Sequence, residues 1–318
     1  MGNVRGNVRS VDCELRDRAI QWLTSPNNGP VLPDGGVLSW VNPKHEGYRY
    51  PEAAAWLLAL LTEEDGPPDL RGKMAAALER SVSSNGSCGR NGYGYVFDTA
   101  IVYSALQKHA ASGGKLIDAT VLPRLLEFVS RKIRQQLSVW PSGGLNGAWS
   151  AQYGCHLLRV AGILAATGER ELASKVFNDL IRLEHAGRFR NHARTDTTYL
   201  HAHCYATQGL LMLGEGGIDQ AYEIAERSAH WLAGVLNDDG GIPAWYHLGQ
   251  TTGPSRGDAT AQAVRIWSAI DQTAFADSID CGMRFLASLQ TQSGGLRYDI
   301  ESNDVNTWVT TFTVQALR

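Results

Sequence analysis

The chain has 318 residues, of which 43% are hydrophobic and 19% are charged, with a formal net charge of −3. This composition is typical of a globular protein, and the nearly balanced charge argues against a nucleic-acid-binding surface. No apolar run is long enough to cross a membrane, no apolar signal-peptide core is visible, and the five scattered cysteines suit a reducing compartment, so we expect a cytoplasmic protein.

A pattern that recurs roughly every 45–55 residues predicts six helical hairpins. In each copy an amphipathic helix leads to a Gly-containing turn, an aromatic-rich loop follows, and a second, more apolar helix ends the copy. The first helices are expected at 12–23, 70–82, 119–136, 169–184, 218–236 and 271–289. The second helices are expected at 51–61, 98–109, 150–166, 198–213, 258–270 and 305–317. Signals for strands are almost absent.

The turns between the two helices carry glycine at or near a left-handed position, where a side chain would be strained. They read PDGGVLSW at 33–40, GYGYVFD at 92–98, PSGGLNGAW at 141–149, AGRF at 186–189, DDGGIPAWY at 238–246 and QSGGLRY at 292–298.

Six hairpins with no polar capping copy at either end favour closure into a ring. We therefore expect an all-α fold, an (α/α)6 toroid that forms one domain over residues 1–318. The more apolar second helices would form the inner ring, and the loops that precede them would surround one mouth of a central pocket.

The segment 195–213, TDTTYLHAHCYATQGLLML, concentrates reactive side chains at the start of one predicted inner helix. Asp196, His201, His203 and Cys204 lie within nine residues there. These side chain types can transfer protons or bind a metal ion. A purely structural helix entry is the alternative.

The first turns of the other inner helices also carry polar groups. Asp98 and Asp258 are candidate acid–base residues together with His201 and His203, although an aspartate at a helix start also fits a capping role. Polar and aromatic side chains of the same helix starts and loops are candidate substrate-binding residues. They are Glu52, Trp149, Tyr153, Asp196, Tyr199, Arg188, Arg190, Arg194, Trp245, Tyr246, His247, Tyr298, Asp304 and Asn306.

The repeated Gly-Gly-aromatic units, of which QTQSGGLRY at 290–298 is the clearest, resemble the terpenoid-cyclase and protein-prenyltransferase superfamily. The segments GGLNGAWSAQYGCH at 143–156 and YLHAHCYATQGL at 199–210 are similar to the zinc-binding segments of prenyltransferase β-subunits. The resemblance implies a toroid with zinc on Cys155 and on His201 or His203. Cys204 is a further candidate ligand from its position beside these residues.

The chain departs from the prenyltransferase pattern at two places. Tyr153 stands where that family has a zinc aspartate, and Ala148 and Ala151 replace basic residues that bind diphosphate. Both changes argue against prenyl transfer. The Asp-rich motif of squalene–hopene-type cyclases is also missing, because Asp98 and Asp258 each stand alone.

Four functions stay open at this point. The first is metal-free acid–base catalysis of a cyclisation, isomerisation or elimination of a small organic substrate. The others are a zinc-dependent prenyltransferase-like enzyme, a sugar epimerase or glycoside hydrolase of an α/α toroid class, and a non-catalytic binding scaffold. The locally basic segment 185–194, with Arg188, Arg190 and Arg194, suggests that the small-molecule substrate is anionic; a solvated loop is the alternative.

Overall fold

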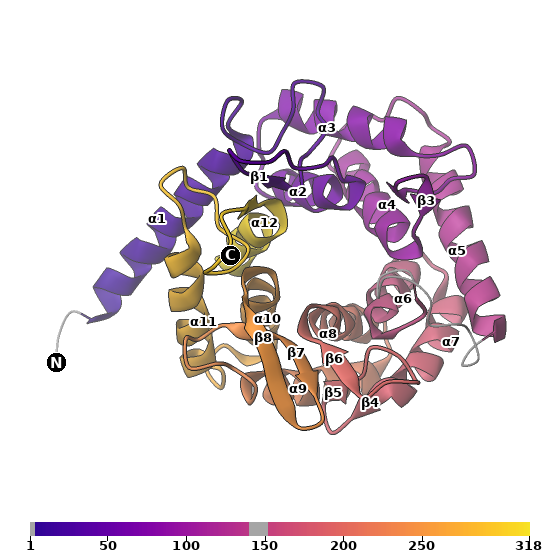
Figure 1. Cartoon of the computed structure of the whole chain (residues 1–318). Coiled ribbons are helices and arrows are strands. Elements are labelled where there is room, and N and C mark those ends of the chain that lie inside the picture. Colours follow the sequence, from indigo (N-terminus) through magenta and orange to yellow (C-terminus); the bar gives the residue numbers. More distant parts are fainter. Residues whose placement is uncertain (1–3, 140–151) are drawn as a thin grey trace.

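The computed structural model of the chain describes residues 4–139 and 152–318. Twelve α-helices in this part of the chain form two concentric rings around a central axis (Figure 1). The outer ring consists of α1 (Val4–Thr24), α3 (Pro68–Ser81), α5 (Val121–Val139), α7 (Arg170–Leu180), α9 (Asp219–Ala233) and α11 (Ala276–Leu289). The inner ring consists of α2 (Pro51–Glu63), α4 (Val96–Ala111), α6 (Leu158–Ala166), α8 (Leu200–Glu215), α10 (Gly257–Asp271) and α12 (Thr307–Ala316). The structure confirms the (α/α)6 toroid.

The inner helices are more deeply buried than the outer helices, as their more apolar sequences predicted. Twelve of the 16 residues of inner helix α8 are buried, against six of the 15 residues of outer helix α9. An inner helix contacts neighbours on nearly all sides, so it needs an almost continuous apolar surface, whereas an outer helix needs only one apolar stripe. None of the described helices combines the length and hydropathy needed to cross a lipid bilayer.

The ring is closed by contacts between the first and last repeats. Helix α12 packs against α2 and α1 (Figure 1). Next to this junction, β1 (Trp40–Val41) pairs with β9 (Val305–Asn306) in antiparallel register, with Trp40 opposite Asn306. The loops before α2 and α12 are therefore fixed to each other at one mouth of the toroid.

Glycines in the turns between outer and inner helices allow each repeat to pack closely against the next outer helix. Gly294 has φ of 99°, and a Cβ atom on it would lie 2.4 Å from the main-chain oxygen of Arg18 in α1. Only glycine allows both this backbone conformation and this close approach. The same pair of properties recurs, each time against the next outer helix, at Gly35, Gly86, Gly187 and Gly240.

In the second repeat the glycine with this role differs from the prediction. The sequence pattern assigned the turn to 92–98, whereas the structure places it six residues earlier, at Gly86. Gly92 and Gly94 instead belong to a small hairpin of β2 (Gly89–Arg90) and β3 (Tyr93–Gly94). The turn predicted at 141–149 lies outside the described residues.

Short strands, which we expected to be almost absent, connect the helices. Besides β1–β3 and β9 they are β4 (Glu184–His185), β5 (Arg188–Phe189), β6 (Thr197–Tyr199), β7 (Ile242–His247) and β8 (Gln250–Arg256). Strands β6, β7 and β8 form one antiparallel sheet. Leu248 and Gly249 join β7 to β8, both with positive φ, as in the type I′ turn that favours a tight hairpin.

Candidate active site

A cavity of about 410 Å³ lies at the mouth where the inner helices begin. Helices α2, α4, α8, α10 and α12 each contribute side chains from their first turns or from the residues just before them. The cavity is lined by Trp40, Tyr48, Tyr50, Glu52, Arg90, Phe97, Asp98, Tyr199, His201, Tyr205, Asp258, Tyr298, Asp304, Asn306 and Trp308. Aromatic rings and ionisable groups therefore share one enclosed space.

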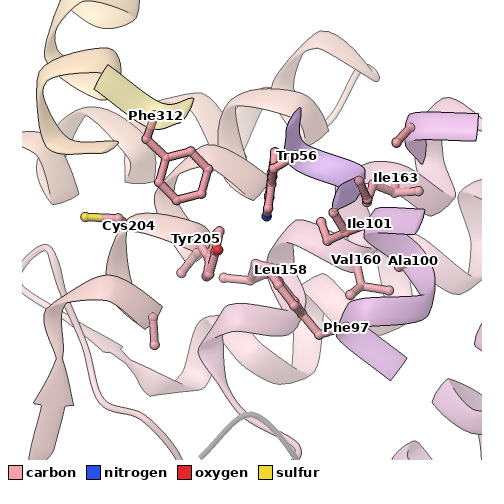
Figure 2. Packing of buried hydrophobic residues seen from close by; sticks show 14 of the residues in the cluster. Trp56, Phe97, Ala100, Ile101, Leu158, Val160, Ile163, Cys204, Tyr205 and Phe312 are labelled. Carbon is pink, nitrogen blue, oxygen red and sulfur yellow. The ribbon is translucent and has the colours of Figure 1, made fainter. Parts of the chain in front are cut away.

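Aromatic side chains form the floor of the cavity. The ring of Tyr205 lies 4.6 Å from that of Phe97 and is nearly parallel to Trp56, at 6.0 Å between centroids. Phe312 packs edge-on against Trp56 at 5.3 Å (Figure 2). All four side chains are buried, so the cluster is a packed part of the core beside the cavity.

Glu52 is the most heavily hydrogen-bonded carboxyl group in the cavity. Its Oε1 accepts hydrogen bonds from Trp56 Nε1 at 2.5 Å and from the Tyr205 hydroxyl at 3.1 Å, and its Oε2 accepts one from Trp308 Nε1. An indole N–H can only donate, so these contacts favour the ionised carboxylate. Burial and the charge of Asp98 act in the opposite direction and raise the pKa of Glu52.

Asp98, only 2% exposed, is the second carboxyl group on this side of the cavity. Burial raises its pKa, and a hydrogen bond from Tyr50 and the charge of Arg90 offset part of this increase. Its Oδ2 atom is buried without a hydrogen-bond partner among the described residues. Two buried carboxyls that oppose each other's ionisation retain a proton near neutral pH. Burial raises the pKa of Glu52 to about 8 and that of Asp98 to about 7, but we place the proton on Asp98, because three donors hold the charge on Glu52.

Asp258 lies across the cavity and pairs with a histidine. Its Oδ2 is 3.0 Å from His201 Nδ1, and its Oδ1 accepts a hydrogen bond from the Ala259 amide at 2.8 Å. Burial by itself would raise the pKa of Asp258, but the charge and hydrogen bond of His201, with the Ala259 bond and the Arg256 charge, lower it below the usual value. With Asp258 ionised, His201 carries its proton on Nδ1, so Nε2 is the basic nitrogen.

The two acidic sites of the cavity therefore differ in protonation. The pair of Asp98 and Glu52, whose pKa values burial raises to about 7 and about 8, holds a proton near neutral pH, whereas Asp258, with a lowered pKa, is a carboxylate paired with an imidazole. Groups whose pKa values are driven apart in one pocket can serve as the acid and the base of a reaction.

Aromatic rings line the wall between these groups and the solvent. Trp40 and Tyr48 lie 4.8 Å apart, Tyr48 and Tyr50 lie 5.7 Å apart, and Trp308 follows Tyr50 at 5.5 Å. The guanidinium group of Arg90 lies over the Tyr48 ring at 4.6 Å. A flat, partly polar ligand fits such a wall.

Eight of the residues predicted from the sequence line this cavity. They are Glu52, Asp98, Tyr199, His201, Asp258, Tyr298, Asp304 and Asn306. The Tyr199 and Tyr298 hydroxyls are 3.5 Å apart, and Asn306 also caps α12 by accepting a hydrogen bond from the Val309 amide. Asp304 Oδ1 accepts a hydrogen bond from Asn42 Nδ2 at 2.7 Å and lies 3.1 Å from His45 Nε2.

The four predicted zinc ligands do not come together. His203 packs between Phe189 and Trp231, where its Nδ1 accepts the Phe189 amide, and burial lowers its pKa to about 3. The thiol of Cys204 donates to the main-chain oxygen of Ala259, and Cys155 is fully buried. Over residues 4–139 and 152–318, no group of three or more His, Cys, Asp or Glu side chains is arranged to hold a metal ion. Helical geometry separates His203 from His201, because residues two positions apart lie about 200° apart around a helix.

The predicted basic segment lies outside the cavity lining. Arg188 pairs with Asp196 and covers the Tyr246 ring at 5.2 Å. Arg194 is exposed, and the Arg190 amide bonds the Leu183 oxygen at 3.1 Å.

The remaining predicted residues also lie outside the lining. Trp245 packs on Tyr199 with ring centroids 4.5 Å apart, so it supports the cavity from behind. His247 contacts Thr197 at 3.1 Å. Tyr153 is half-buried, and burial raises its pKa. Trp149 lies outside the described residues.

Seven lining residues are not among these eight. Trp40, Tyr48, Tyr50 and Trp308 belong to the aromatic-rich loops and helix start expected at this mouth, and Arg90, Phe97 and Tyr205 were missed as candidates. Tyr205 stands four positions after His201 and so shares its face of α8, and Phe97 directly precedes Asp98. These spacings were visible in the sequence. Arg90 lies on the short strand β2, and its position depends on how the β2–β3 hairpin folds over the mouth.

The chain is similar to known proteins in its structure but not in its sequence. The sequence matches no protein-family model, and the search of curated proteins finds no similar sequence. Solved structures do match over nearly the whole chain. A sugar epimerase from a ruminal bacterium is 12% identical, with a TM-score of 0.72 and 98% of each chain covered.

Two further matches have the same architecture. Cellobiose 2-epimerase from Bacillus thermoamylovorans B4167 is 10% identical, with a TM-score of 0.70, covering 97% of this chain and 99% of its own. An unsaturated glucuronyl hydrolase specific for heparin is 13% identical, with a TM-score of 0.64, covering 97% of this chain and 94% of its own. These matches support the toroid but not the expected relation to terpenoid cyclases and prenyltransferases. The chain shares the (α/α)6 toroid fold with structures of two epimerases and a glucuronyl hydrolase.

Proposed function

We propose that the protein is a carbohydrate-active enzyme that cleaves a glycosidic bond in this cavity by general acid–base catalysis. One observation supports the proposal above all: a protonated carboxyl, Asp98, and an ionised carboxylate–imidazole pair, Asp258 and His201, line the same aromatic-walled pocket. Glycoside hydrolysis needs one acid for the leaving oxygen and one base for the attacking water.

Asp98 is the general acid in this proposal. Its raised pKa keeps the proton available near pH 7, and its Oδ2 is not engaged by any described residue. Glu52 stays ionised on its three donors and stabilises the positive charge that develops on the sugar in the transition state. After proton transfer, Tyr50 remains as a donor to the Asp98 carboxylate.

His201 is the general base, and Asp258 is its positioning residue. The hydrogen bond to Asp258 fixes the imidazole with Nε2 basic and stabilises the imidazolium that forms when the water loses its proton. The side-chain amide of Gln262 lies 3.0 Å from His201 Nδ1 and restricts the ring further; with the proton on Nδ1, the amide turns its oxygen toward this nitrogen.

The wall formed by Trp40, Tyr48, Tyr50 and Trp308 suits a sugar, because aromatic faces pack against the C–H faces of pyranose rings. A volume of about 410 Å³ accommodates one or two sugar units. The names of the structural matches, which describe sugar epimerases and a glucuronyl hydrolase, agree with this substrate class.

Epimerisation of a reducing sugar is the second candidate. It is favoured by the His201–Asp258 pair, since an imidazole held by a carboxylate can remove a proton from a carbon next to a carbonyl group. Asp98 would then return a proton from the other side.

Proton NMR of the purified protein with a panel of neutral and acidic disaccharides in D₂O separates the two reactions. Hydrolysis produces new reducing-end signals, whereas epimerisation exchanges a ring proton for deuterium without cleavage. Asp98→Asn and His201→Gln should each lower the rate by about 10²–10⁴-fold. The exposed Asp238→Asn variant is the control and should keep the wild-type rate.

Deuterium exchange without cleavage would replace hydrolysis by epimerisation. Full activity of both Asp98→Asn and His201→Gln on any sugar that the protein turns over would refute the assignment of acid and base. Absence of both turnover and binding across the panel would refute the proposed substrate class.

A further inference from the structure

A second cavity, of about 580 Å³, lies toward the opposite end of the toroid. Four successive inner helices each contribute a long polar side chain: Arg159 from α6, Gln208 from α8, Arg265 from α10 and Gln315 from α12. The other polar residues of the lining are Asp12, Glu215, Ser268, Gln272 and Arg318. The proposed catalytic reaction uses none of them.

Two arginines of this cavity lack acidic partners. Neither Arg159 nor Arg265 forms an ion pair with any described residue. Arg265 Nη1 donates to Gln315 Oε1 at 2.6 Å, and the Arg159 guanidinium lies over the Trp56 ring at 5.2 Å. Burial lowers the pKa of each to about 10, and the charge of Arg159 lowers that of Arg265 further. Two partly buried like charges that repel each other are unfavourable unless an anion joins them.

Unused hydrogen-bonding groups lie beside these charges. Gln208 is 5% exposed, and neither its side chain oxygen nor its nitrogen has a partner among the described residues. The Nε atom of Arg159 is also buried without a partner in that part of the chain. Buried polar groups are normally satisfied, so this combination indicates a ligand with acceptor oxygens.

The charges of Glu63 and Glu215 act on Arg159, but among the described residues neither carboxylate forms an ion pair with it or with Arg265. Glu215 lines the same cavity but is exposed, and Asp12 is half-buried. Glu63 is paired with Lys108 and Arg318, and Glu64 is paired with Arg16 and Arg318. The inner part of the cavity therefore keeps an excess of positive charge.

The aromatic cluster separates this cavity from the candidate active site. Trp56 donates to Glu52 on the active-site side and carries Arg159 over its ring (Figure 2 shows Trp56 within the cluster). Tyr205 and Phe312 pack against the same indole ring. The two cavities share no lining residue, so a ligand in the second would occupy a site distinct from that of a sugar in the first.

We propose that this second cavity is a binding site for a small oxyanion, a phosphate or carboxylate group of a free metabolite, held by Arg159 and Arg265 with Gln208 as an additional donor. Guanidinium groups form paired hydrogen bonds with such oxygens, which compensates the two charges together. The site differs from the anionic-substrate contact expected at Arg188, Arg190 and Arg194.

Thermal unfolding and isothermal titration calorimetry with inorganic phosphate and with citrate, at constant ionic strength set by chloride, test the proposal. At least one anion should raise the unfolding midpoint with saturation. Arg265→Gln and Arg159→Gln should weaken binding at least tenfold, and Arg265→Lys should weaken it too, because lysine cannot make the paired contact.

Two further variants locate the site. Arg131 also contacts an aromatic ring, Phe128 at 5.6 Å, but is exposed and outside the cavity, so Arg131→Gln should bind as the wild type does. Arg90→Gln removes the arginine of the other cavity and should also leave binding unchanged. Loss of binding in Arg90→Gln with retention in Arg159→Gln and Arg265→Gln would overturn the proposal, as would no saturable effect of either anion on the wild type.

Discussion

Replacement of Asp98 by asparagine should stabilise the protein at alkaline pH while it removes the proposed acid. Burial raises the pKa of Asp98 above its unfolded value of about 3.8, so the native state binds more protons than the unfolded state between these two pKa values. The contribution of Asp98 to stability is therefore complete below about pH 4 and is lost as the pH rises through the native pKa. The amide that replaces the carboxyl group cannot ionise, so the variant escapes this loss.

The magnitude follows from the free-energy equivalent of a pKa difference. Each pKa unit is worth about 1.4 kcal/mol. Burial and the charge of Asp98 also raise the pKa of Glu52. Between pH 5 and pH 8 the unfolding free energy of Asp98→Asn should rise by at least about 1.4 kcal/mol relative to wild type. With a urea m-value of about 3 kcal/mol/M, the midpoint difference should change by about 0.5 M or more.

Urea unfolding followed by tryptophan fluorescence at pH 5 and pH 8 measures this difference. Asp238→Asn, at an exposed position, should show the same change with pH as wild type. Asp258→Asn should behave differently, because Asp258 has a lowered pKa and holds His201; its loss should destabilise the protein by about 1–3 kcal/mol at both pH values. An Asp98→Asn difference that is equal at pH 5 and pH 8, or smaller at pH 8, would refute the shared-proton description.

Two further predictions concern the scaffold. Gly294→Ala should destabilise the protein by at least about 2 kcal/mol more than Gly168→Ala. Both glycines have φ above 90°, but only a Cβ at Gly294 meets the main chain of α1. Equal effects of the two variants in urea unfolding would contradict this explanation. His203, with its pKa lowered to about 3, stays neutral when the unfolded state takes up a proton, so stability should fall by up to about 1.4 kcal/mol per pH unit from pH 6.5 toward pH 3. His203→Gln should flatten this dependence, and an unchanged slope would show that other groups cause it.

The amino-acid sequence by itself determined the hairpin architecture. Helical periodicity and glycine-containing turns repeat six times, and each predicted helix corresponds to an observed one within a few residues, apart from the starts of α1, α6 and α11. It also identified Glu52, Asp98, His201 and Asp258, because inner helices that run in the same direction bring their first turns to one mouth. Local patterns suffice for these features, since they depend only on which residues neighbour each other along the chain.

Only the tertiary structure decided which side chains of one helix face the cavity. His201 and His203 are separated by about 200° around α8, so one lines the cavity and the other packs against α9 and its neighbours. The sequence motif made them equivalent candidates for a zinc ligand, whereas in the structure the two imidazoles lie in different surroundings. Protonation likewise depends on the tertiary surroundings. Burial raises the pKa of Asp98, whereas His201 from another repeat outweighs burial at Asp258 and lowers its pKa, so two similar helix-start aspartates acquire opposite pKa shifts.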